Sequence, residues 1–171
     1  TERLWGSPLT AAEQMRQRIW DELGFTVNIG ISSNKLLAKM AGDFEKPNKI
    51  HTLFPEEMEK KFFPLPVRDL FLVGAATERK LKLMGIYTIG DLAKADVKIL
   101  KKRLGKHGET IWHFANGRNA DIVTSETAEN KGINEIFLLI EVDSGVTGYD
   151  GIDLSDTAVL PNGRKQFWKI I

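Results

Sequence analysis

The sequence predicts an α+β fold, in which a partial sheet with flanking helices is followed by a small all-helical domain and a short irregular tail. Helical and strand patterns alternate over residues 1–63, short helical patterns alone fill residues 64–118, and residues 119–171 are mostly polar. Alternation of helices and strands is typical of mixed folds, whereas a run of helices builds its own layer. We therefore predict these three ranges as the domains.

The first helix of residues 1–63 has clear signals at both ends. Ser7 followed by Pro8 is typical of a helix start, because serine accepts hydrogen bonds from free N–H groups and proline suits the first helical position. Gly24 is expected to end the helix. Apolar residues between these ends recur at spacings of three and four, which predicts one buried face.

A strand, a helix and a second strand are predicted next. The first strand covers residues 25–31, and Asn28 and Gly30 interrupt its apolar pattern. A glycine inside a strand indicates that another part of the chain comes close to it. The second helix is expected to begin at the serine pair Ser32–Ser33, and a short strand at residues 50–53 follows.

The helical domain begins after the stiff segment Pro64–Pro66 and holds about five short helices. Thr88 and Asp96 are expected to cap two of them, because both side chains can accept hydrogen bonds from the first N–H groups of a helix. The other helices are predicted at residues 67–71, 77–84 and 105–116. In the tail, the apolar run within residues 134–142 predicts one strand.

Charge is distributed unevenly along the 171 residues. Residues 59–118 carry 13 basic and 6 acidic side chains, a net charge of +7, whereas the whole chain has a net charge of +1. Such a block is expected of a module that binds a polyanion. The alternative is a set of helices with solvated, lysine-rich faces.

The sequence has no cysteine and no apolar run of about 20 residues, so we expect a cytoplasmic protein without a membrane span.

The hairpin between the helices at 67–71 and 77–84 is the first candidate site. A helix-hairpin-helix turn exposes backbone N–H groups that can bind a phosphate, and glycine lets a DNA backbone come close. The alternative is an ordinary helical hairpin. Leu72 would be strained if its position requires a positive φ. The candidate DNA-binding residues here are Val73, Gly74, Ala75, Arg79 and Lys80.

A second basic group follows in the helical domain. It could form another surface that faces phosphates, or it could be a solvated helix face. Its candidate DNA-binding residues are Lys101, Lys102, Arg103 and Lys106.

Lys46 is the candidate nucleotide-binding residue. Pro47 disfavours a helical conformation at Lys46, which places this lysine on an extended turn at a helix exit. There it could act as a point charge on a triphosphate. The alternative is an exposed lysine that complements the helix dipole. We identify no catalytic and no metal-binding residues.

Residues 1–123 resemble a Y-family DNA polymerase of the DNA polymerase IV-like translesion type. The resemblance rests on the motifs Gly24–Ser32, Ser33–Lys39, Lys46–Asn48, Pro64–Leu70, Gly85–Ala93, Gly105–Gly108 and Ala115–Gly117.

This resemblance implies that residues 1–63 are the end of a palm domain and residues 64–118 a thumb that grips the primer–template DNA. It implies that residues 119–171 are a linker and a little-finger remnant, and that Lys46 contacts the triphosphate of the incoming nucleotide. Family partners would be DNA, a deoxynucleoside triphosphate and a sliding clamp. The family uses magnesium, for which we expect no cofactor site in this chain, because the family's catalytic carboxylates would lie before Thr1.

The resulting expectation is a fragment of a translesion DNA-directed DNA polymerase that takes part in DNA repair and damage tolerance. Polymerisation needs carboxylates that hold two metal ions, so we expect the chain alone to bind primer–template DNA without extending it. The alternative is an inert or protein-interaction scaffold, derived from a polymerase, with no DNA binding.

Overall fold

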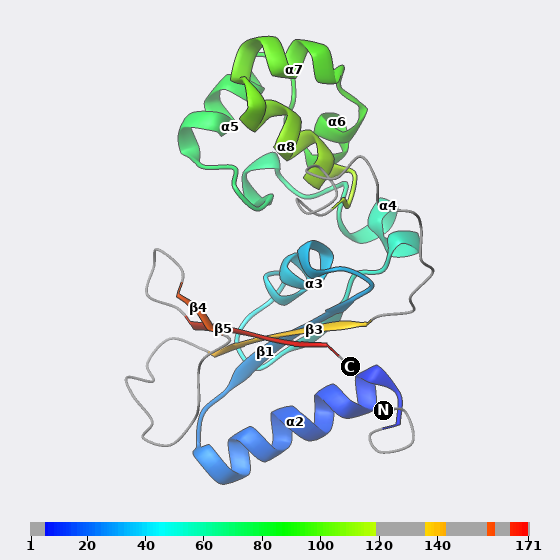
Figure 1. Ribbon diagram of the computed structural model, residues 1–171, viewed down its shortest axis with the longest axis vertical. Coiled ribbons are helices and arrows are strands. Elements are labelled where there is room, and N and C mark those ends of the chain that lie inside the picture. Colours follow the sequence, from blue (N-terminus) through cyan, green and yellow to red (C-terminus); the bar gives the residue numbers. More distant parts are fainter. Residues whose placement is uncertain (1–5, 119–135, 143–156, 160–164, 171) are drawn as a thin grey trace. The chain divides into compact units, whose positions relative to one another are not determined.

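The protein forms two compact units, which are described separately here (Figure 1). We call residues 1–53 with residues 134–171 the sheet unit, and residues 54–133 the helical unit. In the described part of the chain, no helix is long and apolar enough to cross a membrane. The computed structural model describes residues 6–118, 136–142, 157–159 and 165–170.

The sheet unit begins with helix α2 (Pro8–Leu23). The Ser7 hydroxyl accepts a hydrogen bond from the backbone N–H of Thr10 at 3.2 Å, and Pro8 occupies the first helical position. The helix ends at Gly24, whose backbone N–H donates to the carbonyl oxygen of Trp20. Both predicted helix ends are therefore confirmed.

Strand β1 (Val27–Ser32) is buried along its whole length. Helix α3 (Lys35–Gly42) follows it and begins at Asn34, whose side-chain oxygen accepts from the N–H of Leu37 at 2.9 Å. The prediction of a serine cap at Ser32–Ser33 was therefore wrong. Ser32 still belongs to the strand, and its hydroxyl donates to the carbonyl oxygen of Leu53 at 2.6 Å.

The close approach predicted at Gly30 is confirmed. A Cβ atom added there would lie 1.9 Å from the carbonyl oxygen of Ala38 and 2.6 Å from the backbone nitrogen of Gly42. Helix α3 therefore packs directly on the backbone of β1. Because side chains alternate across a strand, Val27, Ile29 and Ile31 point to the other face, on which α2 lies (Figure 1).

The sheet has five strands in the order β2-β1-β3-β5-β4. The short strand β2 runs parallel to β1, and the other neighbouring strands are antiparallel. The strands added to β1 are β2 (Ile50–Thr52), β3 (Phe137–Val142), β4 (Thr157–Val159) and β5 (Lys165–Ile170).

The tail is more regular than expected. The predicted strand at 134–142 is confirmed as β3, but it pairs with β1, and β5 pairs with β3 in turn. The described tail strands therefore complete the sheet of the first unit instead of remaining irregular. The assignment of residues 119–171 to a little-finger remnant stays a prediction.

The helical unit is built from short helices around an apolar core, and Thr88 and Asp96 cap α6 and α7 as predicted. Among its described residues, seven large side chains are fully buried: Phe62, Leu70, Leu81, Ile89, Leu92, Leu100 and Ile111. Its elements are η1 (Pro55–Glu57), α4 (Met58–Lys61), η2 (Val67–Asp69), α5 (Ala75–Lys82), α6 (Ile89–Lys94), α7 (Val97–Leu104) and α8 (Lys106–Ala115).

Two predicted helices of this unit have different bounds in the structure. The segment expected to be helical at 67–71 forms only the 3₁₀ turn η2, because Leu70 is already extended. The helix expected at 77–84 begins two residues earlier, directly after Gly74. By packing, η1 and α4 belong to the helical unit, which begins at residue 54. The predicted domains 1–63, 64–118 and 119–171 stay a prediction.

Candidate functional site

In the hairpin before α5, the position of Leu72 requires a positive φ, which is the condition under which the sequence predicted strain. Leu72 has a φ of 69°, and the N–H of Val73 donates to the carbonyl oxygen of Leu70 at 2.9 Å. Leu72 is therefore held in the left-handed region, which is unfavourable in free energy for any residue that has a Cβ atom. Its side chain is half exposed, so packing does not compensate for this strain.

The N-terminus of α5 is open. Gly74 precedes it, no side chain caps it, and a Cβ atom at Gly74 would have no neighbour within 4 Å. The capped helices α6 and α7 differ, because the side chains of Thr88 and Asp96 accept from their first N–H groups. The first N–H groups of α5 are thus available to an external acceptor, and the helix dipole favours an anion there.

A second open helix start lies beside the first. Gly105, with a φ of 66°, precedes α8 and provides no side-chain cap. Thr77 lies in the first turn of α5 and His107 in the first turn of α8, and the Thr77 Oγ1 and His107 Nε2 atoms are 3.4 Å apart. Two helix N-termini that lack side-chain caps therefore meet on one exposed surface.

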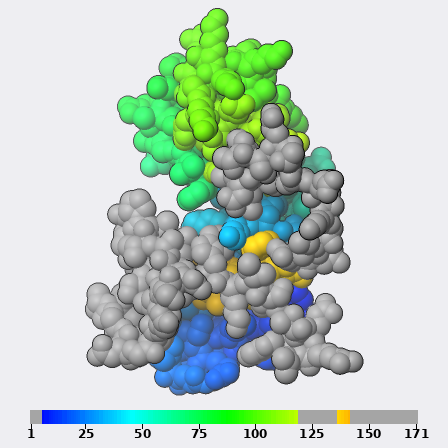
Figure 2. Space-filling view, in the orientation of Figure 1, coloured from blue at the N-terminus to red at the C-terminus, as the bar shows by residue number. Residues whose placement is uncertain are grey.

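The predicted basic side chains are all exposed on the elements that form this surface. Lys101 pairs with Glu109 at 2.8 Å, and its hydrogen bond is the main reason that the pKa of Glu109 is lowered. The C-terminal turn of α7 leads directly to the N-terminus of α8. Figure 2 shows the helical unit mostly in green, with groups of atoms that project from its outline. Arg79 and Lys80 lie on α5, Lys101, Lys102 and Arg103 on α7, and Lys106 on α8.

We call these two helix starts with their basic side chains the twin-N-terminus surface. It comprises Gly74, Ala75, Arg79, Lys80, Lys101, Lys102, Arg103, Gly105, Lys106 and His107. The predicted residue Val73 lies outside this surface, because its side chain is buried and its N–H donates to Leu70 within the hairpin. Sequence reasoning missed the contact between Thr77 of α5 and His107 of α8. The available signal was a glycine directly before each helix with no capping side chain.

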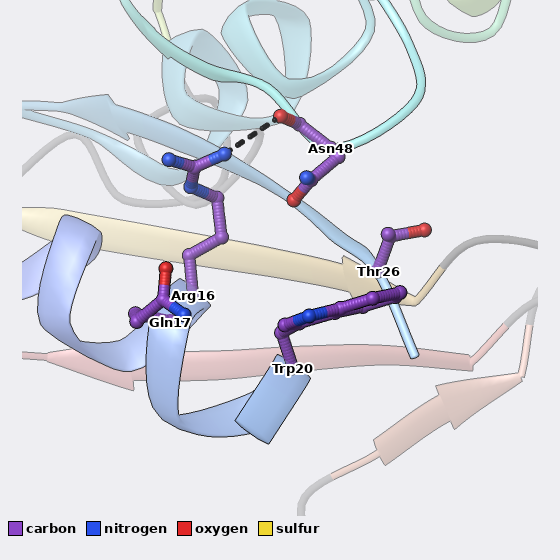
Figure 3. Close-up of a pocket in the computed structure, with 5 residues that line it drawn as sticks. All are labelled: Arg16, Gln17, Trp20, Thr26 and Asn48. Atoms are coloured by element: carbon purple, nitrogen blue, oxygen red, sulfur yellow. Dashed lines mark hydrogen bonds between the residues drawn. The ribbon is translucent and has the colours of Figure 1, made fainter. Parts of the chain in front are cut away.

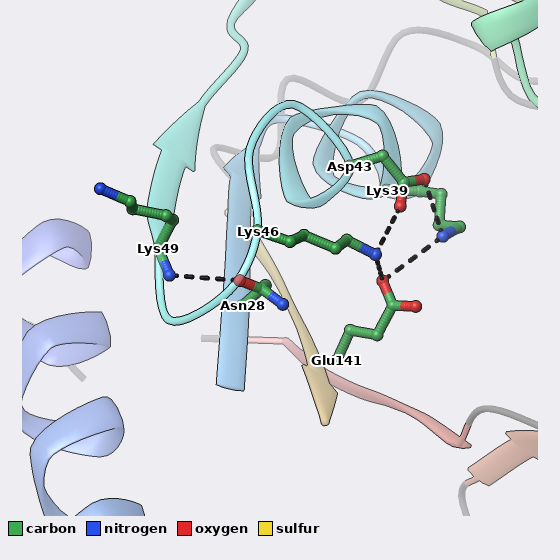
Figure 4. Close-up of polar contacts among 6 residues, drawn as sticks. All are labelled: Asn28, Lys39, Asp43, Lys46, Lys49 and Glu141. Atoms are coloured by element: carbon green, nitrogen blue, oxygen red, sulfur yellow. Dashed lines mark hydrogen bonds and ion pairs between the residues drawn. The ribbon is translucent and has the colours of Figure 1, made fainter. Parts of the chain in front are cut away.

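Lys46 lies in the sheet unit, in a cluster of two lysines and two carboxylates (Figure 4). Its Nζ atom is 2.8 Å from Asp43 Oδ1 and 2.7 Å from Glu141 Oε2. Lys39 is 2.8 Å from Asp43 Oδ2 and 3.7 Å from Glu141 Oε2. The two cations and two anions balance, so Lys46 is an ion-paired lysine.

The cluster shifts the pKa of two of its groups. Burial opposes the charge of Asp43, but hydrogen bonds from Lys39 and Lys46 outweigh it, so that the pKa of this carboxyl is lowered. Burial also opposes the charge of Lys46, but its hydrogen bonds to Asp43 and Glu141 outweigh this and raise its pKa. Both groups are therefore charged at neutral pH.

Glu141 was not predicted from the sequence. It lies on β3, opposite Asn28 of β1, and only 2 % of its surface is exposed. A buried carboxylate needs charged partners, and Lys39 and Lys46 supply them. The signal for Glu141 was a single acidic residue inside the apolar run of residues 136–142.

Within the described residues, no group of three or more histidine, aspartate and glutamate side chains could hold a metal ion.

Two family models match the chain. Residues 1–43 match the impB/mucB/samB family, and residues 68–119 match a model described as the thumb domain of DNA polymerase iota. The second match covers α5 to α8, which carry the twin-N-terminus surface.

Curated relatives are DNA polymerases. DNA polymerase IV of Clostridium acetobutylicum is 54% identical over 112 residues, which are 65% of this chain and 28% of that protein. DNA polymerase IV of Moorella thermoacetica is 37% identical over 151 residues, which are 88% of this chain and 37% of that protein. The chain thus spans about a third of the length of these relatives.

A solved structure has a similar fold. A ternary complex of Dbh matches with a TM-score of 0.55 and 28% identity, over 70% of this chain and 34% of that chain. The two family models, the relatives and this structure agree with the motifs in the sequence. The chain belongs to the Y-family DNA polymerases.

Proposed function

We propose that this chain is part of a translesion DNA polymerase that takes part in DNA repair and damage tolerance, and that its helical unit binds the backbone of primer–template DNA. The relatives named DNA polymerase IV support the first part. The match to a polymerase thumb domain supports the second.

The observation that carries the DNA-binding proposal is the contact between Thr77 and His107 at 3.4 Å. It places the N-termini of α5 and α8 side by side, so that the free N–H groups of both can face phosphates of one strand. Arg79, Lys80 and Lys106 add attraction that does not depend on base sequence. Backbone binding of this kind suits a protein that must hold DNA of any sequence.

Charge reversal of Lys101, Lys102 and Arg103 to glutamate is expected to weaken binding to a primer–template duplex by more than about tenfold. Each lost phosphate contact should reduce the slope of log affinity against log salt by about one. Fluorescence anisotropy of labelled duplex across a salt titration measures both quantities. The control reverses three exposed charges of the sheet unit, Arg18, Lys35 and Lys49, and gives the same net charge. Equal losses in both variants would contradict the proposed surface and favour the scaffold alternative.

Gly74→Asp tests the helix start itself. Aspartate is a better N-cap than glycine, so the free energy of unfolding should stay equal or rise by a few tenths of a kcal/mol. The carboxylate would occupy the position proposed for a phosphate, and we expect DNA affinity to fall by about fivefold or more. Gly74→Asn caps the helix without charge and should cost less affinity. Undiminished DNA binding by Gly74→Asp would show that phosphate does not approach α5.

We also propose that Lys46 contacts the triphosphate of a nucleotide. Its position at the exit of α3 and its charge support this, and a polyphosphate would have to compete with Asp43 and Glu141 for the same ammonium group.

Magnesium, a deoxynucleoside triphosphate and a sliding clamp are proposals for the whole protein, as is a cytoplasmic location. That this chain alone does not extend primers also stays a prediction.

A further inference from the structure

A polar pocket of about 250 Å³ lies at the C-terminal end of α2 in the sheet unit (Figure 3). It does not involve the helical unit or the Lys46 cluster. Residues from three segments line it: Arg16, Gln17 and Trp20 of α2, Thr26 before β1, and Asn48 in the turn before β2.

Arg16 provides this pocket with a cation that has spare hydrogen-bonding capacity. Its Nη1 atom donates to the carbonyl oxygen of Asn48 at 3.1 Å, but its Nε atom is buried and has no hydrogen-bond partner among the described residues. None of the five lining residues is acidic. An arginine with no carboxylate partner in the part of the chain that the structure describes is a suitable partner for a phosphate, which its planar group binds through two N–H groups.

Trp20 provides an aromatic platform. Its side chain is large, yet 52% of the residue is exposed. Figure 3 shows its ring edge-on, with one face turned toward Thr26 and Asn48 across the pocket. An exposed tryptophan next to a cation is the arrangement on which nucleic-acid bases stack in proteins that bind single strands.

The remaining lining groups suit the edge of a heterocycle. Gln17 uses its Nε2 to donate to Asp21 Oδ1 at 2.9 Å, which directs its Oε1 acceptor elsewhere. Thr26 and Asn48 add a hydroxyl and an amide. These groups can donate to and accept from ring nitrogens and exocyclic groups.

We propose that this pocket binds one nucleoside monophosphate unit, with its base stacked on Trp20 and its phosphate on Arg16. The volume limits the ligand to a single unit, since pockets for drug-sized molecules measure roughly 300–1,000 Å³. The unit comes either from a free nucleotide or from a single strand of nucleic acid, because both present the same ring and phosphate.

Fluorescence titrations with etheno-AMP and with a short labelled oligothymidylate test this proposal. They use the 171-residue chain with Lys101, Lys102 and Arg103 reversed, so that the helical unit does not contribute. Trp20→Ala is expected to weaken binding of the ligand by about 5- to 150-fold. Arg16→Gln is expected to weaken binding of etheno-AMP and of the oligomer by about 10- to 150-fold. Etheno-adenosine lacks the phosphate and should bind more weakly, but with the same affinity to the Arg16→Gln variant as to the parent chain.

Arg18→Gln is the matched control, because Arg18 lies on the same helix but outside the pocket, and it should change nothing. Trp20→Phe should restore most of the affinity lost in Trp20→Ala, which separates stacking from a loss of folding. Binding of etheno-AMP alone, or of the oligomer alone, identifies the source of the unit. The proposal is overturned if neither ligand binds, or if the Arg16 or the Trp20 substitution leaves the affinity unchanged.

Discussion

Replacing Gly30 with alanine is expected to prevent the sheet unit from folding. The added Cβ would lie 1.9 Å from the carbonyl oxygen of Ala38 and 2.6 Å from the backbone nitrogen of Gly42. Both atoms belong to the backbone of α3, so no side-chain rotation relieves the overlap, and the helix would have to move away from β1. We expect a loss of at least about 4 kcal/mol in the free energy of unfolding, a value reached only by severe disruptions of a core.

Gly42→Ala is the matched control for this variant. A Cβ atom there would lie 3.6 Å from the backbone nitrogen of Gly30, which is an ordinary contact. Because alanine favours a helix over glycine by about 0.5–1 kcal/mol, Gly42→Ala should be neutral or stabilising. Urea unfolding followed by circular dichroism compares the two variants. If Gly30→Ala unfolds at the wild-type urea concentration, α3 does not pack on β1 as described.

Features encoded by neighbouring residues could be predicted from the sequence. The interruption of a strand pattern at Gly30 indicated a close approach, and Ser7, Thr88 and Asp96 were recognisable as caps because a capping side chain acts on N–H groups within three residues. The exception was Asn34. Its neighbour Ser32 also suits a cap, but the hydrogen bond from the Ser32 hydroxyl to Leu53, distant in sequence, holds it in the strand.

The features that were missed depend on residues far apart in the sequence. Lys46 and Glu141 are separated by 95 positions, and no local pattern indicates that β3 lies beside β1. The apolar pattern of a strand predicts which of its residues are buried, but it does not predict which other strand pairs with it. The same holds for Thr77 and His107, whose contact turns two separate helix starts into one surface.

Replacing Glu141 with glutamine is the second substitution with a large expected effect. The carboxylate of Glu141 is buried. Within the described residues, Lys46 forms ion pairs with Asp43, three residues before it, and with Glu141 on β3. Removal of the Glu141 carboxylate leaves Lys39 and Lys46 with Asp43 as their single anion. Breaking a buried ion pair by removing one partner costs about 3–5 kcal/mol. We expect about 3 kcal/mol, because Lys46 is partly exposed and can turn toward water.

Glu45→Gln provides the surface control for this charge change. The Glu45 side chain is 66% exposed, so its removal should alter the free energy of unfolding by less than about 0.5 kcal/mol. Urea unfolding at neutral pH gives the values for both variants. A Glu141→Gln variant as stable as Glu45→Gln would show that β3 does not deliver Glu141 to the lysines.

The double variant Glu141→Gln/Lys46→Met shows whether the ion pair itself carries the effect. It removes one charge of each sign and leaves Lys39 paired with Asp43 at 2.8 Å. The loss in the double variant should therefore be smaller than the sum of the two single losses by about 1 kcal/mol or more, as for residues in direct contact. Strictly additive losses would mean that Glu141 stabilises β3 by packing and not by its charge. In that case Asp43 would be the carboxylate that holds Lys46, and Glu141→Gln would not change how readily the ammonium group meets a phosphate.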